Sequence, residues 1–88
     1  MASTIRFADA ALADLKRLDR EIQRRIVRYL ETRVARAASP RDFGRPMTGD
    51  KVGLWRDRVG DHRIICRITD GDLTVLVLRV GHRREVYD

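Results

Sequence analysis

The sequence has little cysteine and no long hydrophobic run, and each of these absences excludes a class of protein. A single cysteine, Cys66, excludes an internal disulfide and a zinc site built from several cysteines, and we expect it in the core. The longest apolar run, residues 73–80, is much shorter than the ~18 residues of a membrane span. The chain does not open with a basic segment followed by an apolar run, so no secretory signal is expected. These features predict a cytoplasmic protein that binds no membrane.

The length and composition predict one folded domain over residues 1–88. With 43% hydrophobic and 36% charged residues, the chain is too apolar to be disordered. A chain of 88 residues can bury one core and not two. No internal repeat, linker or low-complexity segment divides the sequence.

The basic residues are almost all arginine. Of the 19 basic residues only Lys16 and Lys51 are lysines, and the formal net charge is +6. A planar guanidinium group binds phosphate through two hydrogen bonds, so this composition favours a polyanion or an acidic protein as partner. A GC-rich genome, whose codons favour arginine, is an alternative source of the same bias.

The first half of the sequence predicts a short strand and two helices. Residues 4–7 form the strand, and Asp9 is a candidate N-cap for the first helix. The apolar positions of that helix are Leu12, Leu15 and Leu18. Asp19 is a candidate N-cap for the second helix, which ends before Pro40. Its apolar stripe consists of Ile22, Ile26, Tyr29, Leu30, Val34 and Ala37.

The second half predicts a loop and then three strands. Residues 41–51 contain two glycines and a proline without any periodicity, so we expect a loop there. Strands are expected at residues 52–59, 62–69 and 73–80, with a tight turn at residues 59–62 and a hairpin turn at Asp70-Gly71. The expected fold class is α+β: an N-terminal strand, an antiparallel helical hairpin, then a three-stranded antiparallel meander, in the order β-α-α-β-β-β.

Because side chains alternate across a strand, parity assigns each strand residue to a face of the sheet. The face under the helices is expected to hold Trp55, Val59, Ile64, Cys66, Ile68, Leu76, Leu78 and Val80. The other face is expected to hold Leu54, Arg56, Arg58, Arg63, Ile65, Arg67, Val75, Val77 and Arg79, with Arg83 at the same parity beyond the strand. One helical hairpin covers one face, so the arginine-rich face is predicted to be open to water.

Like charges on neighbouring strands destabilise a sheet by up to ~1 kcal/mol per pair. Asp57, the acid among these arginines, has the parity of the opposite face and cannot neutralise them. The pattern therefore favours an anion-binding face. The alternative is that exposed arginines serve only to keep the strands soluble.

The last residues add groups suited to RNA chemistry. His82 is the type of side chain best suited to proton transfer near neutral pH, and Tyr87 offers a ring for stacking and a phenol for proton transfer. Arg83 and Arg84 extend the basic surface. Alternatively, His82 caps the strand end and Tyr87 packs over the sheet edge. His62 has the parity of the core, and we expect a structural role for it.

Several segments together resemble the RelE/ParE toxins of bacterial toxin–antitoxin systems. They are ADAALADLKRLDREIQRRI in the helices, PRDFGRPM in the loop, GLWRDRVGDHRIICRI in the sheet and VGHRREVY at the end. The resemblance covers nearly the whole chain and is greatest to the RelE branch. Members of that branch cleave messenger RNA in the ribosomal A site and are held inactive by a cognate antitoxin.

The resemblance also implies roles for individual residues. Arg63 and Arg83 match the two arginines that RelE proteins use on the scissile phosphate, and Tyr87 matches the C-terminal tyrosine that stacks on or helps activate the substrate nucleotide. A pair of family lysines corresponds to Leu54 and Arg56. Arg56 keeps the charge but cannot act as a base, because arginine holds its proton at physiological pH. The predicted catalytic residues are Arg63, Arg83, Tyr87, Arg56 and His82, and the predicted RNA-binding residues are Arg58, Arg67, Arg79 and Arg84, without a metal or cofactor.

The predicted function is that of a toxin that cleaves ribosome-bound mRNA by attack of the 2′-hydroxyl. Its expected partners are a RelB-like antitoxin, the ribosome and mRNA, with the toxin–antitoxin complex dimerising through the antitoxin. One alternative is a ParE-like inhibitor of DNA gyrase that performs no RNA chemistry. Another is an inert basic domain whose arginines reflect only genome composition.

Overall fold

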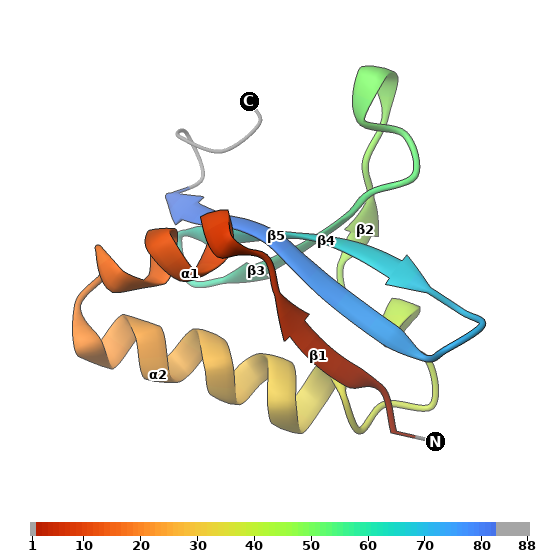
Figure 1. The fold of residues 1–88 in the computed structure, drawn as a ribbon, viewed down its shortest axis with the longest axis horizontal. Helices are drawn as coiled ribbons and strands as arrows, with labels where there is room; N and C mark the ends of the chain where they lie inside the picture. Colours follow the sequence, from red (N-terminus) through yellow and green to blue (C-terminus); the bar gives the residue numbers. More distant parts are fainter. Residues whose placement is uncertain (1, 83–88) are drawn as a thin grey trace.

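A five-stranded sheet forms the centre of the structure, a computed structural model that describes residues 2–82 (Figure 1). In spatial order its strands are β1 (Thr4–Phe7), β5 (Thr74–His82), β4 (His62–Thr69), β3 (Trp55–Val59) and β2 (Arg45–Pro46). The β1 strand pairs parallel to β5, and the other neighbours pair antiparallel. The predicted α+β fold and its C-terminal meander are confirmed. The sheet is wider than the meander because β1 and β2 extend its two edges.

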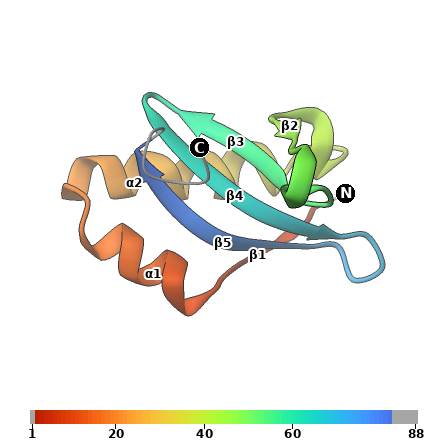
Figure 2. The same ribbon diagram turned by 90° about the horizontal axis from the view of Figure 1, so that it is seen from above.

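The helical part consists of α1 (Asp9–Lys16), α2 (Arg20–Arg28) and a π-helical segment, η1 (Tyr29–Val34), that continues α2. In Figure 1, α1 and α2 run in opposite directions, as predicted. Figure 2 shows α2 behind the sheet and α1 beside β5. None of the helices within residues 2–82 is long and apolar enough to cross a membrane.

Of the two predicted helix caps, the one at Asp9 is wrong and the one at Asp19 is confirmed in position only. Ala8 occupies the N-cap position of α1, and Asp9 lies inside the first turn. Asp19 does occupy the N-cap position of α2, but its side chain makes no capping hydrogen bond. Both acids still lie near helix N-termini, where the helix dipole favours negative charge.

The core lies between the helices and one face of the sheet. Its buried residues are Ala11, Leu15, Ile26, Leu30, Val34, Ile64, Cys66, Val75, Val77 and Val80. Burial raises the pKa of the Cys66 thiol, so the thiol stays protonated at neutral pH. The predicted place of Cys66 in the core is confirmed, as are the helix-side positions of Trp55, Val59 and Ile68, which pack against it.

The predicted face assignment fails along the first half of β5. Ile65 pairs with Arg79, but the next residue, Cys66, pairs with Val77, so Leu78 is an extra residue in β5. Such a β-bulge reverses the parity of everything before it. As a result Val75 and Val77 are buried in the core, whereas Leu76 lies opposite Arg67 on the other face.

The connections also differ from the predicted ones. Residues 41–51 are not one loop, because they contain η2 (Pro40–Asp42), β2 and η3 (Gly49–Lys51). The predicted tight turn between β3 and β4 is confirmed, with Gly60 at φ 59°. The expected Asp70-Gly71 turn is longer. Thr69 pairs with Thr74, so four residues form the turn, and Leu73 takes the left-handed conformation at φ 50°.

Candidate functional site

Four arginines from three adjacent strands gather on the face of the sheet opposite the core. Arg45 of β2 lies directly opposite Arg56 of β3, and Arg58 of β3 lies directly opposite Arg63 of β4. Opposite residues of an antiparallel pair share a face, as do residues two apart in one strand. We call Arg45, Arg56, Arg58 and Arg63 the arginine cluster. The structure thus brings together three predicted site residues and adds Arg45.

The positive charges of the cluster repel one another. Burial lowers the pKa of Arg56, and the charges of Arg63, Arg58 and Arg45 lower it further. Within residues 2–82, no salt bridge to a carboxylate is made by Arg45, Arg56 or Arg58. An anion placed among these guanidinium groups would relieve the repulsion, so the cluster is suited to bind a phosphate.

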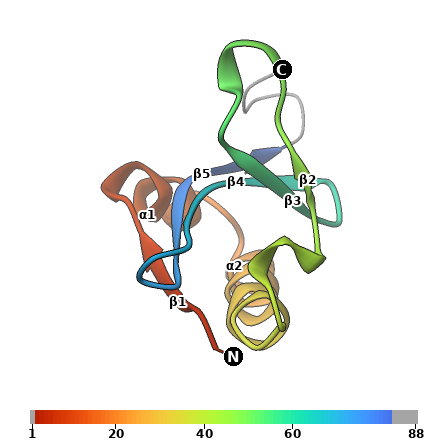
Figure 3. The same ribbon diagram turned by 90° about the vertical axis from the view of Figure 1, so that its right-hand side faces the viewer.

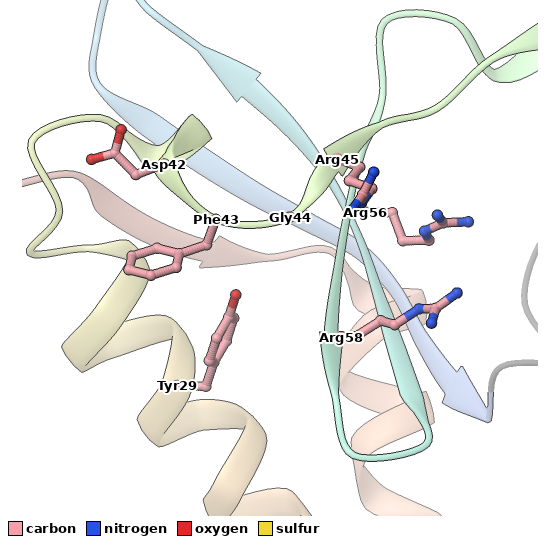
Figure 4. Close-up of a pocket in the computed structure, with 7 residues that line it drawn as sticks. All are labelled: Tyr29, Asp42, Phe43, Gly44, Arg45, Arg56 and Arg58. Carbon is pink, nitrogen blue, oxygen red and sulfur yellow. The ribbon is translucent and has the colours of Figure 1, made fainter.

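Two hollows adjoin the cluster, and Arg45 and Arg56 line both of them. The first, about 710 Å³, is lined by Tyr29, Asp42, Phe43, Gly44, Arg45, Arg56 and Arg58. The second, about 580 Å³, is lined by Arg45, Pro46, Met47, Thr48, Asp50, Lys51 and Arg56. In Figure 4 the guanidinium groups of Arg45, Arg56 and Arg58 point away from the rings of Tyr29 and Phe43.

The opposite side of β3 carries a buried acid. Asp57, only 1% exposed, accepts a 2.6 Å hydrogen bond from the Tyr29 hydroxyl. Burial raises the pKa of Asp57, although the hydrogen bond from Tyr29 opposes this effect. Burial and the neighbouring carboxylate also raise the pKa of Tyr29 well above its ordinary value. This tyrosine therefore keeps its proton at neutral pH and is unsuited to act as a base.

The segment before β2 is held tightly against β3. The Trp55 indole donates a 2.7 Å hydrogen bond to the Phe43 carbonyl. Next to it, Gly44 has φ +75°, and a Cβ there would lie 2.5 Å from the Arg56 carbonyl oxygen and 2.7 Å from Asp57 Oδ1. Only glycine fits this approach without a shift. The close contact places the following residue, Arg45, beside Arg56.

One hydrophobic residue lies among the arginines. Ile65 is fully buried although it lies on the open face, where its cross-strand neighbours are Arg56 and Arg79. Arginine stems cover apolar neighbours while their charged ends reach solvent. Arg67, two residues further along β4, is exposed on the same face. The open face thus continues as a basic surface beyond the cluster.

Arg79, predicted to bind RNA, makes a contact within the protein. Its guanidinium donates hydrogen bonds of 2.9 and 3.1 Å to the carboxylate of Asp14 in α1, which also accepts 2.9 Å from the Val80 N–H. Asp14 is 6% exposed, and burial alone would raise its pKa. The bonds from Arg79 and Val80 outweigh that effect and lower the pKa below the ordinary value. Arg79 therefore joins α1 to β5.

His82 lies apart from the arginine cluster. It pairs with His62, two residues beyond the Ile64–Val80 pair, so the ladder places both histidines at the parity of the core face. Their rings lie 6.0 Å apart in an edge-to-face arrangement. Arg63 pairs with Gly81 and has the opposite parity. The ladder therefore does not bring His82 and Arg63 together.

Three predicted site residues, Arg83, Arg84 and Tyr87, lie outside the described residues. Arg45 is the functional candidate that the sequence interpretation missed, because a two-residue strand next to Gly44 and Pro46 has the composition of a loop. The only signal for it was its position within the PRDFGRPM segment.

Comparisons with known proteins give consistent matches. The sequence model of the family described as "ParE toxin of type II toxin-antitoxin system, parDE" matches residues 5–87. Toxin RelG of Mycobacterium tuberculosis is 33% identical over 87 residues, which cover 99% of this chain and 98% of RelG. The crystal structure of the M. tuberculosis toxin–antitoxin complex RelBE2 contains a similar chain, with a TM-score of 0.87, 32% identity, and coverage of 97% of this chain and 95% of that one.

A more distant structure shares the fold. The RelE–RelB complex of Pyrococcus horikoshii gives a TM-score of 0.67 at 23% identity and covers 98% of this chain and 100% of that one.

Proposed function

The chain belongs to the ParE toxin family of type II toxin–antitoxin systems, and from that premise we propose that it is a RelE-like, ribosome-dependent endoribonuclease. The arginine cluster is the observation that carries this proposal. A group of like charges on an open face costs stability, and binding of an RNA phosphate would offset that cost. The two M. tuberculosis matches, at 33% and 32% identity, carry RelG and RelBE2 names, which supports the RelE branch.

The cluster would act electrostatically. The 2′-hydroxyl of one nucleotide attacks the adjacent phosphorus, its proton leaves, the phosphorus passes through a pentacoordinate phosphorane, and the 5′-oxygen departs with a proton. Arg56 and Arg63 would neutralise the charge that develops on the phosphorane oxygens, and a preorganised charge of this kind is worth several kcal/mol. Arg58 would hold the strand, with Arg67 further along the same face.

Proton transfer needs a group other than these arginines, because guanidinium keeps its proton. His82 has the opposite parity in the sheet, and Tyr29 is held protonated by its contact with Asp57. Tyr87 is therefore the residue that we assign to substrate activation, as the family resemblance implies, with Arg83 as a second contact to the phosphate.

We further propose that a RelB-like antitoxin neutralises the toxin in the cytoplasm. The RelBE2 and P. horikoshii structures are both complexes of a toxin with an antitoxin. An antitoxin segment that places acidic side chains on the arginine cluster would compete with RNA for the same charges.

Induction of the protein in a growing culture tests the nuclease. Mapping of transcript 5′ ends should reveal new ends inside translated regions, and Arg63→Ala should remove both the ends and the growth arrest while still binding the antitoxin. Asp72→Asn, in the turn between β4 and β5, serves as the matched control and should retain full toxicity. Unchanged cleavage by Arg63→Ala would contradict the proposal.

Inhibition of DNA gyrase is the second candidate function, because the matching family model is the one named for ParE toxins. Leu54, which stands where RelE proteins often carry a lysine, also favours it. This alternative predicts altered plasmid supercoiling after induction, without new transcript ends. The two readouts can be taken from the same induced culture.

A further inference from the structure

The second hollow has no role in the chemistry just described. One of its walls is the segment between β2 and β3, which projects from the sheet at the top of Figure 3. A 2.9 Å hydrogen bond from the Met47 N–H to the Leu54 carbonyl closes the base of this segment. The Leu54 N–H donates to Lys51 at 3.1 Å, and the Lys51 N–H donates to Thr48 at 3.3 Å. We call residues 47–53 the projecting loop.

The walls of this hollow combine three kinds of group. Arg45 and Arg56 are shared with the arginine cluster and offer positive charge. Met47 is half-buried and offers an apolar, polarisable surface, whereas the Thr48 hydroxyl and the Asp50 carboxylate lie on exposed residues of the loop. The volume of about 580 Å³ lies within the ~300–1,000 Å³ typical of ligand sites.

These groups match the parts of a nucleotide. The phosphate of the nucleotide would lie against the two arginines, and its base would lie against Met47. The Asp50 carboxylate and the Thr48 hydroxyl would then contact the polar edge of the base. Asp50 would accept a hydrogen bond from an exocyclic amino group, as aspartate does with cytosine. The hollow therefore offers complementary groups to both the phosphate and the base of a nucleotide.

We propose that this hollow is a subsite for the nucleotide next to the phosphate held by Arg45 and Arg56. Because the two hollows share this arginine pair, a single RNA strand would cross the pair and leave one nucleotide under the projecting loop. The strand must be single, since the base has to be unstacked to enter a protein hollow. This inference rests on the proposed function, because it assumes that the cluster binds RNA.

Binding of a short RNA tests the subsite without cleavage. A fluorescent hexanucleotide with 2′-fluoro sugars lacks the attacking hydroxyl, and its affinity for the purified protein is measured by anisotropy. Met47→Ala should weaken binding by about five-fold, because the base would lose its apolar contact. Asp50→Asn should change the preference among the four bases at one position of the hexanucleotide by about ten-fold.

Asp72→Asn is the control for Asp50→Asn, because it removes the same charge from an exposed turn outside both hollows. It should bind RNA as the unaltered protein does. Should Met47→Ala fail to fold, Thr48→Ala replaces it, because Thr48 is exposed and should also weaken binding. Unaltered affinity and base preference in every loop variant tested would overturn the subsite, as would a failure of the unaltered protein to bind the hexanucleotide.

The result can be told apart from failure of the nuclease itself. If loop variants lose RNA binding while the unaltered protein produces no new transcript ends in cells, the subsite stands and the nuclease proposal falls. If all loop variants cut transcripts at the original positions with original frequencies, the nuclease stands and the subsite falls.

Discussion

The two sides of β3 differ in how their charged residues are arranged: the acid on one side has a hydrogen-bond partner, whereas the arginines on the other side lie next to one another. On the core side, Asp57 is 1% exposed and shares a hydrogen bond with Tyr29. On the open side, its neighbours Arg56 and Arg58 face other arginines. A fold needs its buried charges paired, but nothing in folding favours a group of like charges on an open face. The comparison therefore supports a stabilising role for the core side and the proposed binding role for the open side.

The largest effect on stability is expected where the core side leaves no space. Gly44→Ala would place a methyl group within 2.7 Å of Asp57 Oδ1 and Trp55 Nε1, at a backbone φ of +75° that alanine disfavours. We expect a loss of about 3 kcal/mol or more in the free energy of unfolding, measured by urea denaturation.

Gly49→Ala is the control for this substitution. Gly49 also has a positive φ, +68°, but nothing lies within 4 Å of the position of its Cβ. Its loss should be limited to the backbone term, about 1 kcal/mol. Equal losses for the two variants would mean that the close approach of Gly44 to β3 does not contribute to the free energy of unfolding.

Removal of the buried acid should have the next largest effect. Asp57→Ala leaves the Tyr29 hydroxyl without its acceptor and creates a cavity, so we expect a loss of about 2–4 kcal/mol in the free energy of unfolding. A change below about 0.5 kcal/mol would show that this side of β3 does not carry stability.

Arg79 extends the comparison to a paired arginine. Asp14→Asn should lower the free energy of unfolding by roughly 1–2 kcal/mol at neutral pH, a value reduced for solvent screening because the Arg79 side chain is 43% exposed. Because folding lowers the pKa of Asp14, its contribution is present above the ordinary carboxyl value of 3.8 and is lost as the pH falls through the lowered value. Urea midpoints of the two proteins should therefore differ at pH 7 and converge in acid.

Arg58→Ala should have the smallest effect on stability. The substitution removes one member of the directly opposed Arg58–Arg63 pair, so we expect a gain of up to ~1 kcal/mol at low salt that shrinks at high salt. A loss larger than 1 kcal/mol would contradict the division between the two sides of β3.

The parts of the fold that could be predicted from the sequence are those marked by local patterns of residues. The bounds of β4 and the turn at Gly60 were predicted because alternation and turn residues are read within a few positions. The bulge at Leu78 was not, because it lies in a uniform apolar run with no glycine to mark it. That one extra residue exchanged the faces of Val75 and Leu76.

The candidate site could likewise be predicted only where local sequence patterns position its residues. Parity within β3 and the tight turn to β4 predicted that Arg56, Arg58 and Arg63 lie on one face, and the strand pairing confirms it. The sequence did not indicate that Arg79 would pair with Asp14, because the two residues are 65 positions apart and meet only after α1 packs against β5. It also did not indicate Arg45, whose strand exists only through pairing with β3.

The most direct test of the account uses Arg56, the residue shared by both hollows and repelled by every other member of the cluster. Purified Arg56→Ala and unaltered protein are added to translating ribosomes, the rate of mRNA cleavage is measured by primer extension, and both proteins are unfolded in urea. We predict a fall in cleavage rate of about 10²–10³-fold with the free energy of unfolding unchanged to within about 1 kcal/mol. Cleavage at the original rate, or a loss of activity matched by unfolding of the variant, would contradict the assignment of this face to RNA.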